Sequence, residues 1–227
     1  MVATAGSRLW RVWLAWRFRF WQRRRHRRLV LERVQGHPLV VLPETFNPSL
    51  FFSSELLAGV LPSVVMPGAR ILDMGTGTGI QALVAASLGA HVVAVDLVPD
   101  ACRCARINAL LNRCECQIDV RQGDLFAPVM GEQFELVLFN PPYYRGRPLS
   151  DWEHAWRSAD VLDRFAAGLR DVLAPGGRAI LVVSSATAGI HDALHGHALR
   201  SRVLLEKSQP SEQFAILEWM PASEGAQ

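Results

Sequence analysis

From residue 70 onward, short apolar runs alternate along the chain with longer segments of helical pattern. Strands that are apolar on both faces and separated by helices are typical of a parallel sheet that helices cover on both sides. The apolar runs cover residues 70–74, 91–96, 117–121, 134–139 and 178–184, and the helical segments cover residues 79–88, 99–112, 159–173 and 187–196. The alternation therefore predicts an α/β fold built on a doubly wound, mostly parallel sheet.

The last two apolar runs, residues 201–207 and 213–220, depart from this alternation. Only a short turn that contains Pro210 separates them, and two strands so close in sequence pair antiparallel. With these runs the sheet has seven predicted strands, the last of which is antiparallel.

The segment before the sheet carries weaker signals. Residues 8–31 have an imperfectly amphipathic helical pattern, and residues 39–42 have an extended one. A further helix is expected over residues 50–61, with Pro62 helping to end it. We therefore predict two parts, an N-terminal helical extension over residues 1–38 and one domain over residues 39–227.

Positive charge is concentrated near the N-terminus. Residues 1–35 contain ten Arg and one acid, Glu32, whereas the rest of the chain has more acidic than basic residues. Arg interleaved with Trp suits phosphate backbones and bases, so contact with RNA, DNA or the ribosome is one interpretation. The other is a helix packed on the body with a solvated Arg face, and a membrane-surface helix is a variant of it. The apolar run Leu9–Trp21 is too short, and too interrupted by Arg, to be a transmembrane segment.

Four cysteines lie close together in the sequence, at Cys102, Cys104, Cys114 and Cys116. No signal peptide precedes them, so we interpret them as reduced thiols of a cytoplasmic protein. Positions i and i+2 on a helix point to different sides, so the two C-x-C pairs do not predict a metal site. The histidines near residue 195 lack the acidic partner of a zinc helix motif, and we expect no metal.

The stretch "ILDMGTGTGI" is a predicted strand that runs into a glycine-rich turn and a helix. Gly75, Gly77 and Gly79 allow a ligand to approach the backbone closely. Residue 80 is Ile, so the spacing is G-x-G-x-G and differs from the dinucleotide-binding fingerprint. Asp96 ends the next strand, where a carboxylate can accept hydrogen bonds from ribose hydroxyls, although it can also cap the following helix.

The motifs "LDMGTGTG", "VVAVD", "GDLF" and "FNPPY", in this order and spacing, resemble class I S-adenosylmethionine-dependent methyltransferases. More narrowly, they resemble the N-P-P-Y type, which includes HemK-like glutamine N-methyltransferases and adenine-N6 methyltransferases. The resemblance covers about residues 40 to 220. It implies a Rossmann-like methyltransferase fold and S-adenosyl-L-methionine as the cofactor.

The resemblance also implies roles for individual residues. The glycines wrap the methionine part of the cofactor, Asp73 lies near its amino group, and the segment that contains Thr45 closes over it. Asp96 holds the ribose, Leu97 lies against the adenine, and Asp124 with Leu125 reads the adenine edge. The implied cofactor-binding residues are Thr45, Asp73, Gly75, Gly77, Gly79, Asp96, Leu97, Asp124, Leu125 and Asn140.

The turn Asn140-Pro141-Pro142-Tyr143 follows a predicted strand. Proline fixes φ and lacks an N–H, so the Asn140 side-chain oxygen and the Pro141 carbonyl are held where they can accept two N–H bonds. Tyr143 offers a flat ring against a planar acceptor group. An amide or amino nitrogen is a poor nucleophile, and such positioning supplies much of the rate of methyl transfer. We predict these four residues to be catalytic, the alternative being a plain turn that ends a strand.

Three functions remain open at this point. The chain is predicted to methylate a protein glutamine, with a release factor as partner. Alternatively it methylates a nucleic acid, at adenine N6 or guanine N2, or a small planar amide or amine. The third interpretation is a cofactor-binding fold that serves as a partner subunit without catalysis. The intact N-P-P-Y turn argues against this last one.

Overall fold

The computed structural model of the protein describes residues 28–43, 45–141, 144–145, 157–158, 160–184, 197, 199–209 and 212–222. Two predicted segments, the N-terminal helix up to residue 27 and the helix over residues 187–196, lie outside these residues. Among the helices in the described ranges, none is both long and apolar enough to cross a membrane.

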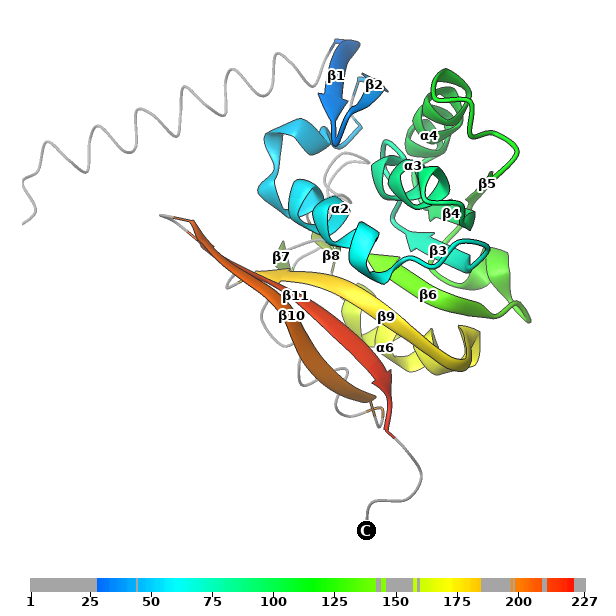
Figure 1. Ribbon diagram of the computed structural model, residues 1–227, viewed down its shortest axis with the longest axis vertical. Coiled ribbons are helices and arrows are strands. Elements are labelled where there is room, and N and C mark those ends of the chain that lie inside the picture. Colours follow the sequence, from blue (N-terminus) through cyan, green and yellow to red (C-terminus); the bar gives the residue numbers. More distant parts are fainter. Residues whose placement is uncertain are drawn as a thin grey trace, which may run out of the picture.

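A seven-stranded sheet forms the centre of the molecule, with the strand order β10-β11-β9-β6-β3-β4-β5 (Figure 1). The strands are β3 (Arg70–Met74), β4 (His91–Asp96), β5 (Ile118–Gln122), β6 (Phe134–Phe139), β9 (Leu173–Ser184), β10 (Leu199–Gln209) and β11 (Glu212–Pro221). The five strands from β9 to β5 run parallel, whereas β11 is antiparallel to both of its neighbours. The structure therefore confirms the predicted seven-stranded, mostly parallel sheet with an antiparallel last strand.

Helices cover both faces of the sheet. On one face lie α2 (Phe52–Val64), α3 (Ile80–Ser87) and α4 (Pro99–Leu111), and on the other lies α6 (Val161–Val172) (Figure 1). The short elements are η1 (Pro48–Leu50), η2 (Ala127–Val129) and the parallel pair of β7 (Tyr144–Arg145) with β8 (Arg157–Ser158).

Alternation along the strands divides the core in two. Ile71 is fully buried in the cluster that includes residues of α2 and α3, and the next residue, Leu72, is fully buried in the cluster that includes Phe165 of α6. Successive side chains of a strand point to opposite faces, so a strand without polar interruptions supplies both cores. This explains why the central strands read as continuous apolar runs in the sequence.

Two local predictions were wrong. Pro62 lies inside α2, which continues to Val64, so the proline does not end the helix. Residues 30 and 31 were predicted as helix but belong to β1 (Val30–Val34), which pairs antiparallel with β2 (His37–Val41). The two-residue turn between them places Gln35 at φ 49° and Gly36 at φ 82°, the left-handed conformation that tight hairpin turns require. The predicted domain boundary between residues 38 and 39 stays a prediction. The β1–β2 hairpin has residues on both sides of this boundary.

Asn108 of α4 joins the hairpin to the rest of the molecule. Its side chain is fully buried, and its Oδ1 accepts a hydrogen bond from the Val40 N–H at 2.7 Å. Its Nδ2 donates to the Val40 carbonyl at 2.8 Å and to the Thr78 carbonyl of the glycine loop at 2.9 Å. One amide thus joins β2, α4 and the loop that precedes α3.

Replacing this amide should destabilise the protein. Asn108→Ala leaves the buried Thr78 carbonyl and the half-buried Val40 N–H without this amide, and an unsatisfied buried group costs about 1–3 kcal/mol. We expect the free energy of unfolding in urea to fall by about 2 kcal/mol or more, with an unchanged denaturant slope.

Asn112→Ala is the matched control, because the Asn112 side chain bonds the Pro38 and Asn108 carbonyls from a half-buried position that water reaches more easily. It should cost less than half as much as Asn108→Ala. Equal losses in the two variants would contradict the special role given to Asn108.

Candidate active site

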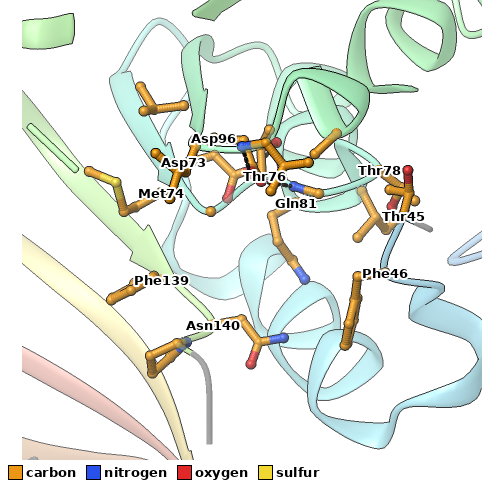
Figure 2. Close-up of a pocket in the computed structure, with 18 of the residues that line it drawn as sticks. Thr45, Phe46, Asp73, Met74, Thr76, Thr78, Gln81, Asp96, Phe139 and Asn140 are labelled. Carbon is orange, nitrogen blue, oxygen red and sulfur yellow. Dashed lines mark hydrogen bonds between the residues drawn. The ribbon is translucent and has the colours of Figure 1, made fainter. Parts of the chain in front are cut away.

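A pocket lies at the carboxyl ends of β3, β4 and β6, the edge of a parallel sheet where ligands bind in such folds (Figure 2). The predicted site residues that line it are Thr45, Asp73, Gly75, Gly77, Asp96, Leu97, Leu125, Asn140 and Pro141. Gly79 and Asp124 do not line it, and Pro142 and Tyr143 lie outside the described residues. The structure therefore brings together most of the residues that the motifs singled out, whose individual roles stay predictions.

The glycine loop turns the chain from β3 into α3. Gly77 has φ +55°, and a Cβ added there would lie 3.9 Å from the Cβ of Phe46 across the pocket. Gly79 has φ +83° and precedes α3, and an added Cβ would meet Ala105 of α4 at 3.2 Å. Gly77 thus leaves backbone open to the pocket, whereas Gly79 lets the loop pack closely on α4.

The carboxylate of Asp96 holds this loop in place. Its Oδ2 accepts a hydrogen bond from the Gly77 N–H at 2.8 Å, and its Oδ1 accepts one from the Val98 N–H, at the start of α4, at 2.9 Å. Each carboxylate oxygen has two lone pairs, so accepting these bonds does not by itself prevent Asp96 from accepting from ribose hydroxyls as well. Capping the next helix and binding a ligand are therefore compatible for this residue.

Asp73 is a buried carboxyl at the end of β3. Its Oδ2 accepts hydrogen bonds from the Thr76 hydroxyl at 2.6 Å and from the Ala82 N–H at 3.2 Å. Burial raises the pKa of Asp73 from 3.8 to about 7, against the lowering effect of those two bonds. A cationic ligand beside it would favour the charged form. This end of the pocket therefore suits a positively charged group.

Of the residues predicted to bind adenine, two line the pocket and one does not. Leu97 is 44% exposed and lines the pocket, as does Leu125. The carboxylate of Asp124 instead forms an ion pair with Arg164 of α6 at 2.5 Å. Its predicted contact with the adenine amino group stays a prediction, and it would have to form alongside or in place of this ion pair.

Asn140 and Pro141 follow directly after β6 and line the pocket. The Asn140 Nδ2 donates to the hydroxyls of Ser54 at 3.2 Å and Ser53 at 3.4 Å, both in the first turn of α2. These bonds hold the amide in one orientation, in which the Oδ1 atom is turned away from the two serine hydroxyls. Two residues that are 86 and 87 positions away in the sequence therefore orient Asn140.

Further residues line the pocket, and of these only Phe46 lies in a segment that the sequence had singled out. Phe46 forms one wall of the pocket, and its ring stacks on Phe51 with centroids 4.6 Å apart. Ser54 and Gln81 bring polar atoms, and Val161 reaches the pocket from the start of α6. Phe46 belongs to the segment Glu44-Thr45-Phe46 that the resemblance implies closes over the cofactor. Gln81 lies two residues after Gly79, beside the glycine motif, whereas Ser54 and Val161 come from distant segments, which no local motif reveals.

The cysteines play no part in this pocket. Cys102, Cys104 and Cys114 are buried, and burial raises the pKa of each thiol. Within the described part of the chain, no group of three His, Cys, Asp or Glu side chains is arranged to hold a metal ion.

Comparison with known proteins points to one family. The model of the family described as methyltransferase small domain matches residues 47–217. The chain is 34% identical over 183 residues to a ribosomal protein L11 methyltransferase of Pelotomaculum thermopropionicum, over 75% of this chain and 52% of that one. It is 30% identical over 187 residues to a release factor glutamine methyltransferase of Shewanella oneidensis, over 70% of this chain and 65% of that one. The chain thus spans about half to two thirds of these relatives.

Among solved structures, the fold is similar to a ribosomal protein L11 methylase of Lactobacillus delbrueckii subsp. bulgaricus. The TM-score is 0.62 at 21% sequence identity, with coverage of 81% of this chain and 84% of that chain. Together these findings confirm the resemblance to class I methyltransferases, and the pocket geometry fits their cofactor. The open glycine loop, the Asp96 carboxylate and the cation-favouring Asp73 are the features that would hold it.

The Asp96 carboxylate generates a direct prediction. Asp96→Ala removes the acceptor proposed for the ribose hydroxyls, and a hydrogen bond to a charged group is worth about 1.5–3 kcal/mol. We expect the affinity for S-adenosylhomocysteine, measured by calorimetry, to fall at least about tenfold.

Asp100→Ala is the control, because Asp100 is an exposed acid of α4 that pairs with Arg103. It should leave the affinity unchanged. Asp96→Ala also removes the acceptor of the Gly77 N–H. Thermal unfolding of both variants therefore shows whether a loss of affinity comes with a less stable fold. An Asp96 variant that binds as well as the unmodified protein would dismiss the assignment.

Proposed function

The chain belongs to the methyltransferase small domain family, and we propose that it is an S-adenosylmethionine-dependent N-methyltransferase acting on a planar amide nitrogen. The observation that carries this proposal is the side-chain amide of Asn140, which is held in one orientation directly after the carboxyl end of β6. Its nitrogen is held by two serines, and its neighbour Pro141 lines the same pocket.

The residues of this site would act by positioning. Methyl transfer is an in-line displacement in which the nitrogen bonds the methyl carbon while the carbon–sulfur bond breaks and its electron pair goes to sulfur. The Asn140 Oδ1 and the Pro141 carbonyl accept the two N–H groups of the acceptor, and negative partial charge then lies where positive charge develops on nitrogen. The nitrogen loses its proton after attack, so no strong base has to act first. Phe46 forms one side of the pocket.

A protein glutamine is the acceptor that we propose. The glutamine amide is planar and carries two N–H groups, which matches the two oxygens supplied by Asn140 and Pro141. Support comes from the relatives, since one is named for a release factor glutamine and the other for a ribosomal protein. On this proposal the partner is a protein of translation, such as a release factor, and the enzyme works in the cytoplasm.

A nucleic acid is the second candidate acceptor, and one observation favours it. Residues 1–27 contain eight Arg and no acidic residue. Such a segment would neutralise several phosphates and bring RNA to the enzyme. The hairpin that begins at Val30 shows where this segment can be removed without cutting into the described fold.

Asn140→Ala tests the catalytic role. Losing an acceptor that acts in the transition state should cut turnover by about two orders of magnitude or more. The assay uses tritiated S-adenosylmethionine with separate pools of release factor, ribosomal protein, RNA, DNA and small amides, and the release factor pool should take up label. The affinity for S-adenosylhomocysteine should stay within about twofold. Equal losses of binding and turnover would make Asn140 a structural residue.

Deleting residues 1–27 separates the two acceptors. If the acceptor is a protein glutamine, the truncated enzyme should methylate an isolated release factor domain at nearly the original rate. If the acceptor is RNA, labelling should disappear on truncation, and binding by the full chain should fall linearly with salt on a log–log plot. A full-length variant with Arg23, Arg24 and Arg25 changed to Ala controls for chain length. RNA labelling without release factor labelling would refute the protein acceptor.

A further inference from the structure

A buried glutamine stands at the start of α3, directly behind the glycine loop. Gln81 is 5% exposed and lines the pocket. Its Nε2 donates to the Ser54 carbonyl at 2.9 Å, but its Oε1 has no hydrogen-bond partner within the part of the chain that the structure describes. A buried acceptor without a donor costs free energy, and in a native pocket such an atom calls for a partner that donates to it. No motif in the sequence drew attention to this residue.

The contact with Ser54 fixes the orientation of the amide. A carbonyl only accepts, so the atom of Gln81 that faces Ser54 must be the nitrogen. Figure 2 shows the side chain extending from α3 toward Asn140 and Phe46. Ser54 also holds Asn140 through its hydroxyl, so one serine positions two amides of the pocket.

An unpartnered acceptor requires a ligand that donates. S-adenosylmethionine has three kinds of donor, the adenine amino group, the ribose hydroxyls and the α-ammonium, whereas its carboxylate and sulfonium do not donate. Asp96 and Leu97, the residues predicted for ribose and adenine, lie on the β4 side of the pocket. Gln81 lies on the α2 side, with Asn140 and Phe46 (Figure 2). The donor that remains for it is the ammonium.

Electrostatics favour an additional acceptor at this place. The N-terminus of α3 carries a partial positive charge that disfavours a cation nearby. Asp73 supplies one carboxylate near this end, but its Oδ2 already accepts hydrogen bonds from Thr76 and Ala82. A neutral amide oxygen adds an acceptor without the desolvation cost of a second buried charge.

We propose that Gln81 is a cofactor-binding residue whose Oε1 accepts a hydrogen bond from the α-ammonium of S-adenosylmethionine. The inference rests on the proposed function, since it assigns a residue to the cofactor of that reaction. It concerns binding alone, and no covalent bond to Gln81 forms or breaks.

The test uses calorimetry with three ligands that differ at the amino-acid end. S-adenosylhomocysteine has both the ammonium and the carboxylate, its decarboxylated analogue keeps only the ammonium, and 5′-methylthioadenosine has neither. Gln81→Met keeps the length of the side chain and removes its polar atoms. We expect the affinity for the first two ligands to fall about tenfold or more and the affinity for 5′-methylthioadenosine to stay within about twofold.

Two further variants separate the oxygen of Gln81 from its nitrogen. Gln81→Glu keeps an acceptor oxygen but loses the donor to Ser54, and it should bind S-adenosylhomocysteine more tightly than Gln81→Met does. Gln122→Met, at an exposed position that ends β5, controls for the substitution itself and should change nothing.

The outcomes distinguish this inference from the proposed function. Unchanged affinity of Gln81→Met for S-adenosylhomocysteine would overturn the inference, and so would an equal loss for all three ligands, which would mean that the pocket itself had been damaged. A Glu variant as weak as the Met variant would assign the effect to Ser54 and also overturn it. If the unmodified protein bound none of the three ligands, the proposed function would fail as well.

Discussion

The backbone of the glycine loop is the constraint on which the site depends. Between β3 and α3 the chain passes through left-handed conformations at Gly75, Gly77 and Gly79, which side chains rarely tolerate. Such a turn keeps its shape only if its polar groups are held from outside. Asp96 accepts from the loop and Asn108 donates to it. The loop is therefore held from β4 and from α4, two elements that follow it in the sequence.

The carboxylates that hold the glycine loop also line the pocket, so one residue can have both a structural role and a predicted binding role. Asp73 accepts hydrogen bonds from Thr76 and from the first turn of α3, yet it also lines the pocket. Asp96 behaves in the same way at the end of β4. A carboxylate that organises the empty loop is already oriented when a ligand arrives, so little reorganisation is needed on binding. The acidic residues at the strand ends thus hold the loop and also line the pocket in which a ligand is predicted to bind.

The sequence predicted the sheet because its strands obey a local rule. A strand buried on both faces must be apolar throughout, and each such run in the sequence became a strand of the sheet. The β1–β2 hairpin escaped prediction, because its turn, Gln35-Gly36, is only two residues long and follows a segment of helical pattern. The prediction that Pro62 helps to end the helix was wrong, because tertiary packing overrides the low helix propensity of proline and α2 continues to Val64. The first error thus concerns a short local turn, and the second concerns a helix end that the packing of the whole fold decides.

The pocket itself has a local half and a distant half. The half predicted to bind the cofactor comes from residues 73–98, a short stretch whose order is set by consecutive strand ends, and a motif can therefore predict it. The other half is assembled from Phe46, Ser54 and Asn140, which lie on three separate segments. Its geometry depends on hydrogen bonds such as those of Ser54 to Gln81 and Asn140, which bridge 27 and 86 residues. If the acceptor meets this second half, as the proposed role of Asn140 requires, chains that share the glycine loop can differ in what they methylate. The choice of acceptor then depends on side chains that no single motif contains.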